Sequence, residues 1–262
     1  MNDDLNKIVE LRHDRPHQFL GPHRLPDDQR LVIRAFIPDA AEISVFIKRP
    51  IKKIVNMQKI HPAGLFEAQI TANGDGGDLD YVFRVTDENN RRSVLRDTYQ
   101  FRPADLNSDQ EARFFAGEQC FLFRRLGAQC ETRDATTGVR FGAWAPDALR
   151  VSVVGTFNSW DSRCHPMQRI SASGLWELFI PGVKDGDFYK FEIRTPSGDI
   201  FMKTDPYAFR IEDAPAAAAI VCNLEQAYHW QDGKWREQKA PHGPAIFNLP
   251  SYLPSRMTSS PG

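Results

Sequence analysis

A polar turn that ends in a tryptophan is the segment of this sequence best suited to bind a ligand. Val153-Val154-Gly155 reads as the end of a strand, and Thr156-Phe157-Asn158-Ser159-Trp160-Asp161 follows it directly. A sugar ring can stack its apolar face on an indole, while amide and carboxylate groups nearby can bond its hydroxyls. The turn therefore makes Trp160 and Asn158 candidate carbohydrate-binding residues.

The same tryptophan could instead cap the hydrophobic core of its domain. Tryptophan is largely buried in most proteins, although rarely completely. The local sequence favours neither interpretation, so the choice depends on the elements that position the turn.

Those elements belong to an internal repeat of the chain. Five blocks recur in the same order, at an offset of 108 residues for four of them and 110 for the third. The pairs are Ile33–Ala40 with Phe141–Ala148, Glu42–Val45 with Arg150–Val153, Gly64–Glu67 with Gly174–Glu177, Tyr81–Val85 with Tyr189–Ile193, and Asp97–Phe101 with Asp205–Phe209. Matched blocks at nearly constant spacing indicate two copies of one domain.

Each copy has the pattern of short β-strands. Tyr189, Phe191 and Ile193 alternate with polar residues, which is the period of a half-buried strand, and turn-forming clusters separate such runs. The pattern predicts an all-β fold: two tandem immunoglobulin-like β-sandwiches with a short structured connection and a disordered C-terminal tail. The expected boundaries are 1–107, 108–136 for the connection, 137–237, and 238–262 for the tail. Helical content is expected to be low, and the best helix candidates are Asn2–Leu11 and Leu122–Leu126.

The repeat also bears on Trp160. The first copy has Ile47–Lys52 where the second has Gly155–Trp160, so the turn is specific to the second copy. A tryptophan that caps the core would be expected in both copies, which favours a ligand role. The alternation places Lys190 on the outer face as a third candidate, whereas Trp176 shares the inward pattern and is expected in the core.

Other kinds of function have little support in the sequence. The formal net charge of −1 argues against nucleic-acid binding, and no apolar run approaches the ~20 residues of a membrane span. The four cysteines are irregularly spaced and Met1–Arg15 is polar, so we expect a cytoplasmic protein without a signal peptide. His13, His17 and His23 are interrupted by proline and glycine, and ordinary hydrogen-bonding histidines are favoured over a metal site. No residue is nominated as catalytic, and no cofactor is expected.

Several motifs resemble the N-terminal part of a bacterial 1,4-α-glucan (glycogen) branching enzyme. His17–His23 is similar to the start of the first β-domain of that family. Gly138–Trp160, Gly174–Gly182, Tyr189–Ile193 and Lys203–Ala208 resemble the family-48 carbohydrate-binding module that follows it. The resemblance covers about residues 5–237.

The resemblance implies a function for the chain. Trp160 and Lys190 match positions that contact α-glucan in some modules, which implies weak binding of glycogen or maltooligosaccharides, on the order of millimolar. The full-length family continues into a catalytic (β/α)₈ barrel of typically ~250 residues, with an Asp nucleophile, a Glu acid/base and a second Asp. Neither the barrel nor the carboxylate pair is found in this sequence.

We therefore expect a truncated branching enzyme of glycogen biosynthesis. This chain would be a non-catalytic α-glucan-binding fragment whose missing intramolecular partner is the barrel. A purely structural interdomain scaffold and a glycogen-targeting regulatory protein are the alternatives.

Overall fold

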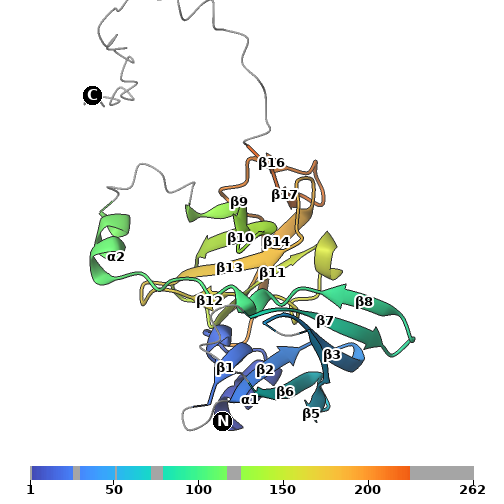
Figure 1. Cartoon of the computed structure of the whole chain (residues 1–262). Helices are drawn as coiled ribbons and strands as arrows, with labels where there is room; N and C mark the ends of the chain where they lie inside the picture. Colours follow the sequence, from blue (N-terminus) through green and yellow to red (C-terminus); the bar gives the residue numbers. More distant parts are fainter. Residues whose placement is uncertain (1, 26–29, 51, 72–78, 117–124, 225–262) are drawn as a thin grey trace, which may run out of the picture. The chain divides into compact units, whose positions relative to one another are not determined.

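The computed structural model describes residues 2–25, 30–50, 52–71, 79–116 and 125–224 (Figure 1). These residues are mostly β-structure, in four antiparallel sheets that form two sandwich-like domains, which confirms the predicted fold class. Among them, no helix is both long and apolar enough to cross a bilayer.

The first sandwich consists of two four-stranded sheets. One has the order β1 (Gly21–Arg24), β2 (Arg30–Phe36), β6 (Leu65–Thr71), β5 (Gln58–His61), and the other the order β4 (Lys53–Asn56), β3 (Ala40–Arg49), β7 (Asp80–Asp87), β8 (Arg92–Leu95). Its core lies between them and contains Ile33, Val45, Phe66 and Tyr81.

One sheet of the second sandwich has the equivalent order, whereas the other has five strands. One sheet runs β12 (Gln168–Arg169), β13 (Leu175–Pro181), β10 (Thr136–Trp144), β9 (Gly127–Arg133). The other runs β11 (Arg150–Gly155), β14 (Phe188–Arg194), β17 (Ala219–Ile220), β16 (Arg210–Ile211), and β15 (Ile200–Lys203) also pairs with β14. The short helices are α1 (Asn2–Val9), η1 (Pro16–Gln18), η2 (Thr98–Gln100), α2 (Ser108–Phe115) and η3 (Thr156–Asn158).

The strand burial agrees with the predicted alternation. In β14, Tyr189 and Phe191 are buried while Lys190 is half-buried on the other face. Trp176 is fully buried, as expected, and its indole nitrogen donates to Ala145 O at 3.0 Å. β13 differs from a half-buried strand because Phe179 on its other face is also buried, against the ring of Phe101. The sequence did not indicate that Phe101, at the end of the first domain, covers this face of β13.

The two sandwiches pack closely within one compact unit that extends to Leu224. Phe19 and Leu20 belong to the same buried cluster as Met167 and Leu178 of the second sandwich. The Tyr99 hydroxyl donates to Pro166 O at 3.1 Å, and the Arg169 amide donates to Asp14 O at 2.8 Å. Polar and apolar contacts therefore join the domains directly.

In the segment 108–136, expected to be a connection, the described residues include α2 and β9. α2 begins after Asn107, whose side chain forms a capping box with Gln110. β9 pairs with β10 from Gly127 to Arg133, so it is an edge strand of the second sandwich. α1 confirms the helix expected at Asn2–Leu11. Most of the helix expected at Leu122–Leu126, and all of the tail 238–262, lie outside the described residues.

Candidate functional site

The turn that carries Trp160 is held by the side chain of Asn158. Its Oδ1 accepts from Gly155 N at 2.8 Å, and its Nδ2 donates to Val153 O at 2.9 Å and lies 2.8 Å from His165 Nδ1. Burial lowers the pKa of His165 to about 4, so this imidazole is neutral near pH 7 and can accept from the amide. Asn158 thus uses its amide inside the turn, where it fixes the backbone that presents Trp160.

Trp160 lies at the surface in an uncommon backbone conformation. Ser159 and Trp160 have φ angles of 53° and 62°, and the Trp160 amide donates to Gly155 O at 3.0 Å. The side chain is 40% exposed, so part of the indole is open to solvent. Consecutive left-handed residues other than glycine carry strain, which the hydrogen bonds of the turn compensate.

Lys190 lies at the same end of the β11–β14 pair as the turn. It is directly opposite Val154 on β11, one residue before Gly155, the residue whose carbonyl binds the Trp160 amide. The ammonium donates to Ala216 O at 2.6 Å, which ties it to the loop before β17 and leaves two of its three donor positions unassigned. Asn158 on η3, Trp160 just after it and Lys190 on β14 therefore all lie near the end of the β11–β14 pair where β11 leaves the sheet.

A charged pair supports the far side of the turn. Arg163 binds both carboxylate oxygens of Asp161, with its Nη2 2.7 Å from Oδ2, and the same nitrogen lies 3.1 Å from Asp39 Oδ1 in the first sandwich. Burial favours the neutral acid, but the hydrogen bonds and charge of Arg163 outweigh it and lower the pKa of Asp161. The Asp161 carboxylate is therefore occupied by Arg163, and this ion pair stabilises the turn.

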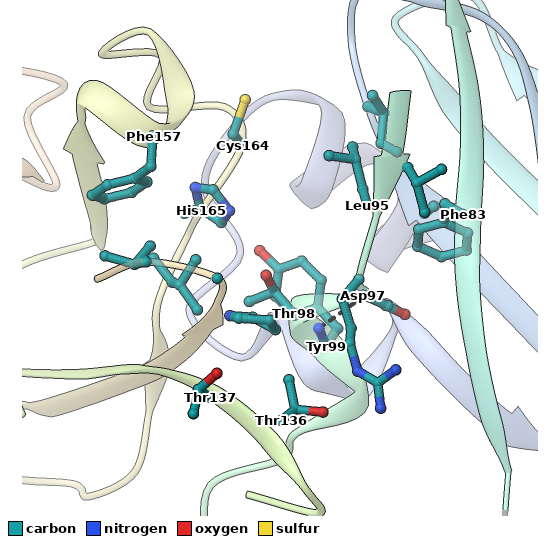
Figure 2. Close-up of a pocket in the computed structure, with 18 of the residues that line it drawn as sticks. Phe83, Leu95, Asp97, Thr98, Tyr99, Thr136, Thr137, Phe157, Cys164 and His165 are labelled. Carbon is teal, nitrogen blue, oxygen red and sulfur yellow. Dashed lines mark hydrogen bonds between the residues drawn. The ribbon is translucent and has the colours of Figure 1, made fainter. Parts of the chain in front are cut away.

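A cleft of about 800 Å³ lies between the two sandwiches, beside this turn (Figure 2). Figure 2 shows Phe157, Cys164 and His165 on one side and Phe83 and Leu95 on the other, with Thr98, Thr136 and Thr137 between them. Burial raises the pKa of the Cys164 thiol to about 12, so it is protonated and not a nucleophile near neutral pH.

Trp144 is an exposed aromatic residue that the sequence analysis did not nominate. It is 54% exposed, its indole nitrogen donates to Ser173 O at 3.0 Å, and its ring lies 6.0 Å from that of Phe115 on α2. Its counterpart in the repeat, Phe36, is buried in the cluster that joins the sandwiches. The sequence has an aromatic residue at both equivalent positions, so it could not show that Trp144 is exposed whereas Phe36 is buried.

The three N-terminal histidines lie in different environments. His13 Nδ1 accepts from Arg15 N at 3.0 Å, His23 Nε2 lies 2.9 Å from Leu20 O, and His17 is buried edge-on against Tyr99. In the described part of the chain, no group of three His, Cys, Asp or Glu side chains has the geometry to hold a metal ion.

Comparisons with known proteins match both halves of the structure. Residues 1–99 match the family model of the alpha-1,4-glucan branching enzyme GlgB N-terminal domain, and residues 125–208 match carbohydrate-binding module 48 (isoamylase N-terminal domain).

Among curated proteins, the chain is 42% identical over 240 residues to the 1,4-alpha-glucan branching enzyme GlgB of Myxococcus xanthus. This match covers 90% of the chain and 31% of the relative. The corresponding enzyme of Rubrobacter xylanophilus is 37% identical, over 94% of the chain and 33% of its own length. A solved pullulanase of Anoxybacillus sp. LM18-11 aligns with a TM-score of 0.34 and 16% identity, over 80% of this chain and 28% of that one.

The chain thus spans about a third of the length of the curated relatives it matches. Over residues 1–99 it belongs to the GlgB N-terminal domain family of alpha-1,4-glucan branching enzymes, and over residues 125–208 to the carbohydrate-binding module 48 family.

Proposed function

We propose that this chain binds α-glucan through the turn around Trp160, with Lys190 as a hydrogen-bond donor, and that it does so without catalysing a reaction. The observation that carries the proposal is an indole 40% exposed on a turn that Asn158 holds rigid, in a domain of a carbohydrate-binding family. A single stacked ring and few hydrogen bonds make the affinity weak, on the order of millimolar.

Preorganisation supports this role for the turn. Asn158, the Asp161–Arg163 pair and the Trp160 amide each fix part of the backbone before a ligand arrives. A rigid platform loses little conformational entropy on binding, so even a small contact surface retains useful affinity. We assign Asn158 the function of shaping the site, and Trp160 and Lys190 the direct contacts.

In the longer relatives, such a module would act by concentrating glucan near an active site. Tethered binding raises the effective concentration of the polymer, even when each contact is weak. A role in glycogen biosynthesis, with a catalytic (β/α)₈ barrel as intramolecular partner, is part of the proposal. The cytoplasmic location expected from the sequence is part of the proposal as well.

Affinity electrophoresis in native gels containing glycogen tests the proposal. The wild-type chain should be retarded in proportion to the glycogen concentration, and Trp160→Ala should strongly reduce the retardation because it removes the stacking surface. Trp144→Ala is the matched control, since Trp144 is an even more exposed tryptophan of the same module.

Circular dichroism spectra must be the same for the three proteins, so that loss of binding is not loss of folding. Unchanged migration of the folded wild type in glycogen would refute the proposal. Equal retardation of wild type and Trp160→Ala would refute the assignment to this turn.

A scaffold role without sugar binding is the second candidate function. It has one specific observation in its favour: several large apolar side chains of the second sandwich are exposed together along one stretch of chain, namely Ile200, Phe201, Met202, Phe209 and Ile211. Exposed apolar groups of this kind often mark contact surfaces. The electrophoresis distinguishes the candidates, because a scaffold predicts no retardation.

A further inference from the structure

We propose that the cleft between the two sandwiches is a second glucan-binding site, independent of Trp160. The existence of the cleft does not depend on the function proposed above, but the class of ligand does. A site of this kind would require both domains, since each contributes one wall (Figure 2).

The cleft has the size and rigidity of a preformed binding site. Its volume of about 800 Å³ falls within the range of about 300–1,000 Å³ typical of small-molecule sites. The Tyr99–Pro166 hydrogen bond and the Arg163–Asp39 ion pair join the two domains beside it. These contacts join the two walls of the cleft before a ligand enters.

The lining combines apolar surface with hydroxyl groups. Leu95 of β8, which is 42% exposed, faces Phe157 of η3 across the cleft (Figure 2). The hydroxyls of Thr98, Thr136 and Thr137 lie between these walls and can each donate and accept hydrogen bonds. Sugars present the same combination, an apolar ring face bordered by hydroxyls.

The charges of the lining favour a neutral ligand. Basic Lys48, Arg49 and Arg96 are balanced by acidic Asp80, Asp97 and Asp134. Arg96 lies 2.8 Å from Asp80, so these two charges are largely satisfied by each other. A phosphate or nucleic-acid site would instead require an excess of positive charge.

The exposed indole of Trp160, called the Trp160 platform below, belongs to the same loop as part of the cleft lining but to a different surface. Phe157 and Asn158 line the cleft, whereas Trp160 does not. The Asn158 amide is already bonded inside the turn, so the cleft side of this loop offers mainly the Phe157 ring. The chain thus presents two glucan surfaces, one on each side of the 156–161 turn.

Titration of the ¹⁵N-labelled full chain with maltoheptaose, followed by amide NMR, tests this inference. The backbone amides of Leu95, Thr98 and Thr136 report on the cleft, and those of Ser159 and Trp160 report on the platform. Leu95→Arg should block the cleft, and because Leu95 is 42% exposed the arginine can be accommodated. Ile54→Arg is the matched control, since Ile54 is 52% exposed on β4 outside the cleft.

Two groups of shifts are expected in the wild type. In Trp160→Ala the cleft shifts should persist with an unchanged midpoint, and in Leu95→Arg they should weaken at least tenfold while the platform shifts remain. Ile54→Arg should behave as wild type. Cellohexaose, with β-1,4 linkages, should shift the cleft amides much less.

Absence of cleft shifts alongside normal platform shifts would overturn this inference and leave the proposed function intact. Loss of the cleft shifts in Trp160→Ala would overturn the independence of the two sites. Cleft shifts that are equal with cellohexaose would overturn the ligand class. If neither group of amides moves with maltoheptaose, the proposed function fails as well.

Discussion

Each sandwich contains a buried tyrosine whose hydroxyl donates to a buried aspartate. Tyr81 bonds Asp97 and Tyr189 bonds Asp205, both at 2.5 Å between the hydroxyl and Oδ2. The other carboxylate oxygen accepts from a backbone amide two residues further on, at Tyr99 or Tyr207. This arrangement gives a physical reason for two of the repeated sequence blocks, because a buried polar group is costly unless its partner is retained with it.

The first residue-scale prediction concerns the pH dependence of Asp97. Burial, partly opposed by hydrogen bonds from Tyr81 and Tyr99 N, raises the pKa of Asp97 from its ordinary 3.8 to about 6. The folded state therefore binds this proton more tightly than the unfolded state, and the free energy of unfolding falls as pH rises from 4 to 6. At ~1.4 kcal/mol per pKa unit, the total loss is about 3 kcal/mol, of which about 2 kcal/mol falls between pH 4 and 6.

Asp97→Asn should remove that dependence. Urea denaturation at pH 4, 5, 6 and 7 should give a free energy of unfolding that falls less between pH 4 and 6 than in the wild type, with exposed Asp213→Asn as control. If the two variants have the same pH profile, Asp97 does not titrate as its burial indicates.

At the scale of elements, the two copies share their framework, and one difference lies beside β3 and its counterpart β11. In the first sandwich β3 continues to Arg49 and pairs with β4. In the second, β11 ends at Gly155 and the chain enters η3, after which His165 and Met167 bond along the free edge of β11. The Trp160 turn thus occupies the position where the first copy has a β-hairpin, so it adds a surface feature without disturbing the sheets.

A glycine contact is repeated at the turns that precede β6 and β13. Gly64 and Gly174 have φ angles of 99° and 85°, and a Cβ on them would lie 2.5 and 2.2 Å from the Cα atoms of Pro38 and Pro146. Both carbonyls accept a strand-end amide, from Ile37 and Ala145 respectively. The close approach explains why this glycine and its proline recur together in the repeat.

Gly174→Ala should therefore destabilise the protein far more than Gly182→Ala. Gly182 has a similar φ of 80° but nothing within 4 Å of a new Cβ, so alanine there meets only the backbone penalty of about 1–2 kcal/mol. Gly174→Ala adds overpacking of about 1–3 kcal/mol, for a total of about 2–5 kcal/mol. Chemical denaturation of the two variants measures the difference, and equal losses would contradict the steric argument.

At the scale of the whole molecule, the segment before β1 joins the two sandwiches. His17 is 2% exposed, its ring lies 5.0 Å from that of Tyr99, and its amide donates to Gln168 Oε1 of the second sandwich at 3.3 Å. Phe19 and Leu20 continue the same junction with apolar contacts. A change in the charge of His17 therefore acts where the domains meet.

Acid should weaken this junction. Burial lowers the pKa of His17 from its ordinary 6.5 to about 3, so below pH 6.5 the unfolded chain takes up a proton that the folded one does not. The contribution of His17 to stability is complete above pH 6.5 and is lost as pH falls, by about 3 kcal/mol at pH 4.

His17→Gln should show a smaller loss of stability between pH 6.5 and 4 than the wild type does. Thermal unfolding across that range measures it, with His61→Gln, a half-buried histidine of β5, as the comparison. An equally steep loss in His17→Gln would exclude this histidine as a source of the acid sensitivity.

Much of the fold was predictable because its signals are local. Alternation along Tyr189–Ile193, turn clusters and the repeat predict strands, their faces and the duplication. α2 was missed, although Asn107 and Gln110 have the spacing of a capping box, because that signal is weak without an apolar period beside it. For the candidate site, the sequence identified Trp160, Asn158 and Lys190 by residue type. It did not show that the Asn158 side chain forms its hydrogen bonds inside the turn.

By itself, the sequence determined that the chain is a duplicated all-β protein with one turn unique to its second copy. These properties follow from the periodicity of the side chains and from residue identity, which are both local features of the sequence. The tertiary structure alone decided which side of the turn is exposed, that Trp144 is open while Phe36 is buried, and that a cleft lies between the domains. Exposure and cavities depend on contacts between residues far apart in sequence, such as Tyr99 with Pro166, and no local pattern encodes them.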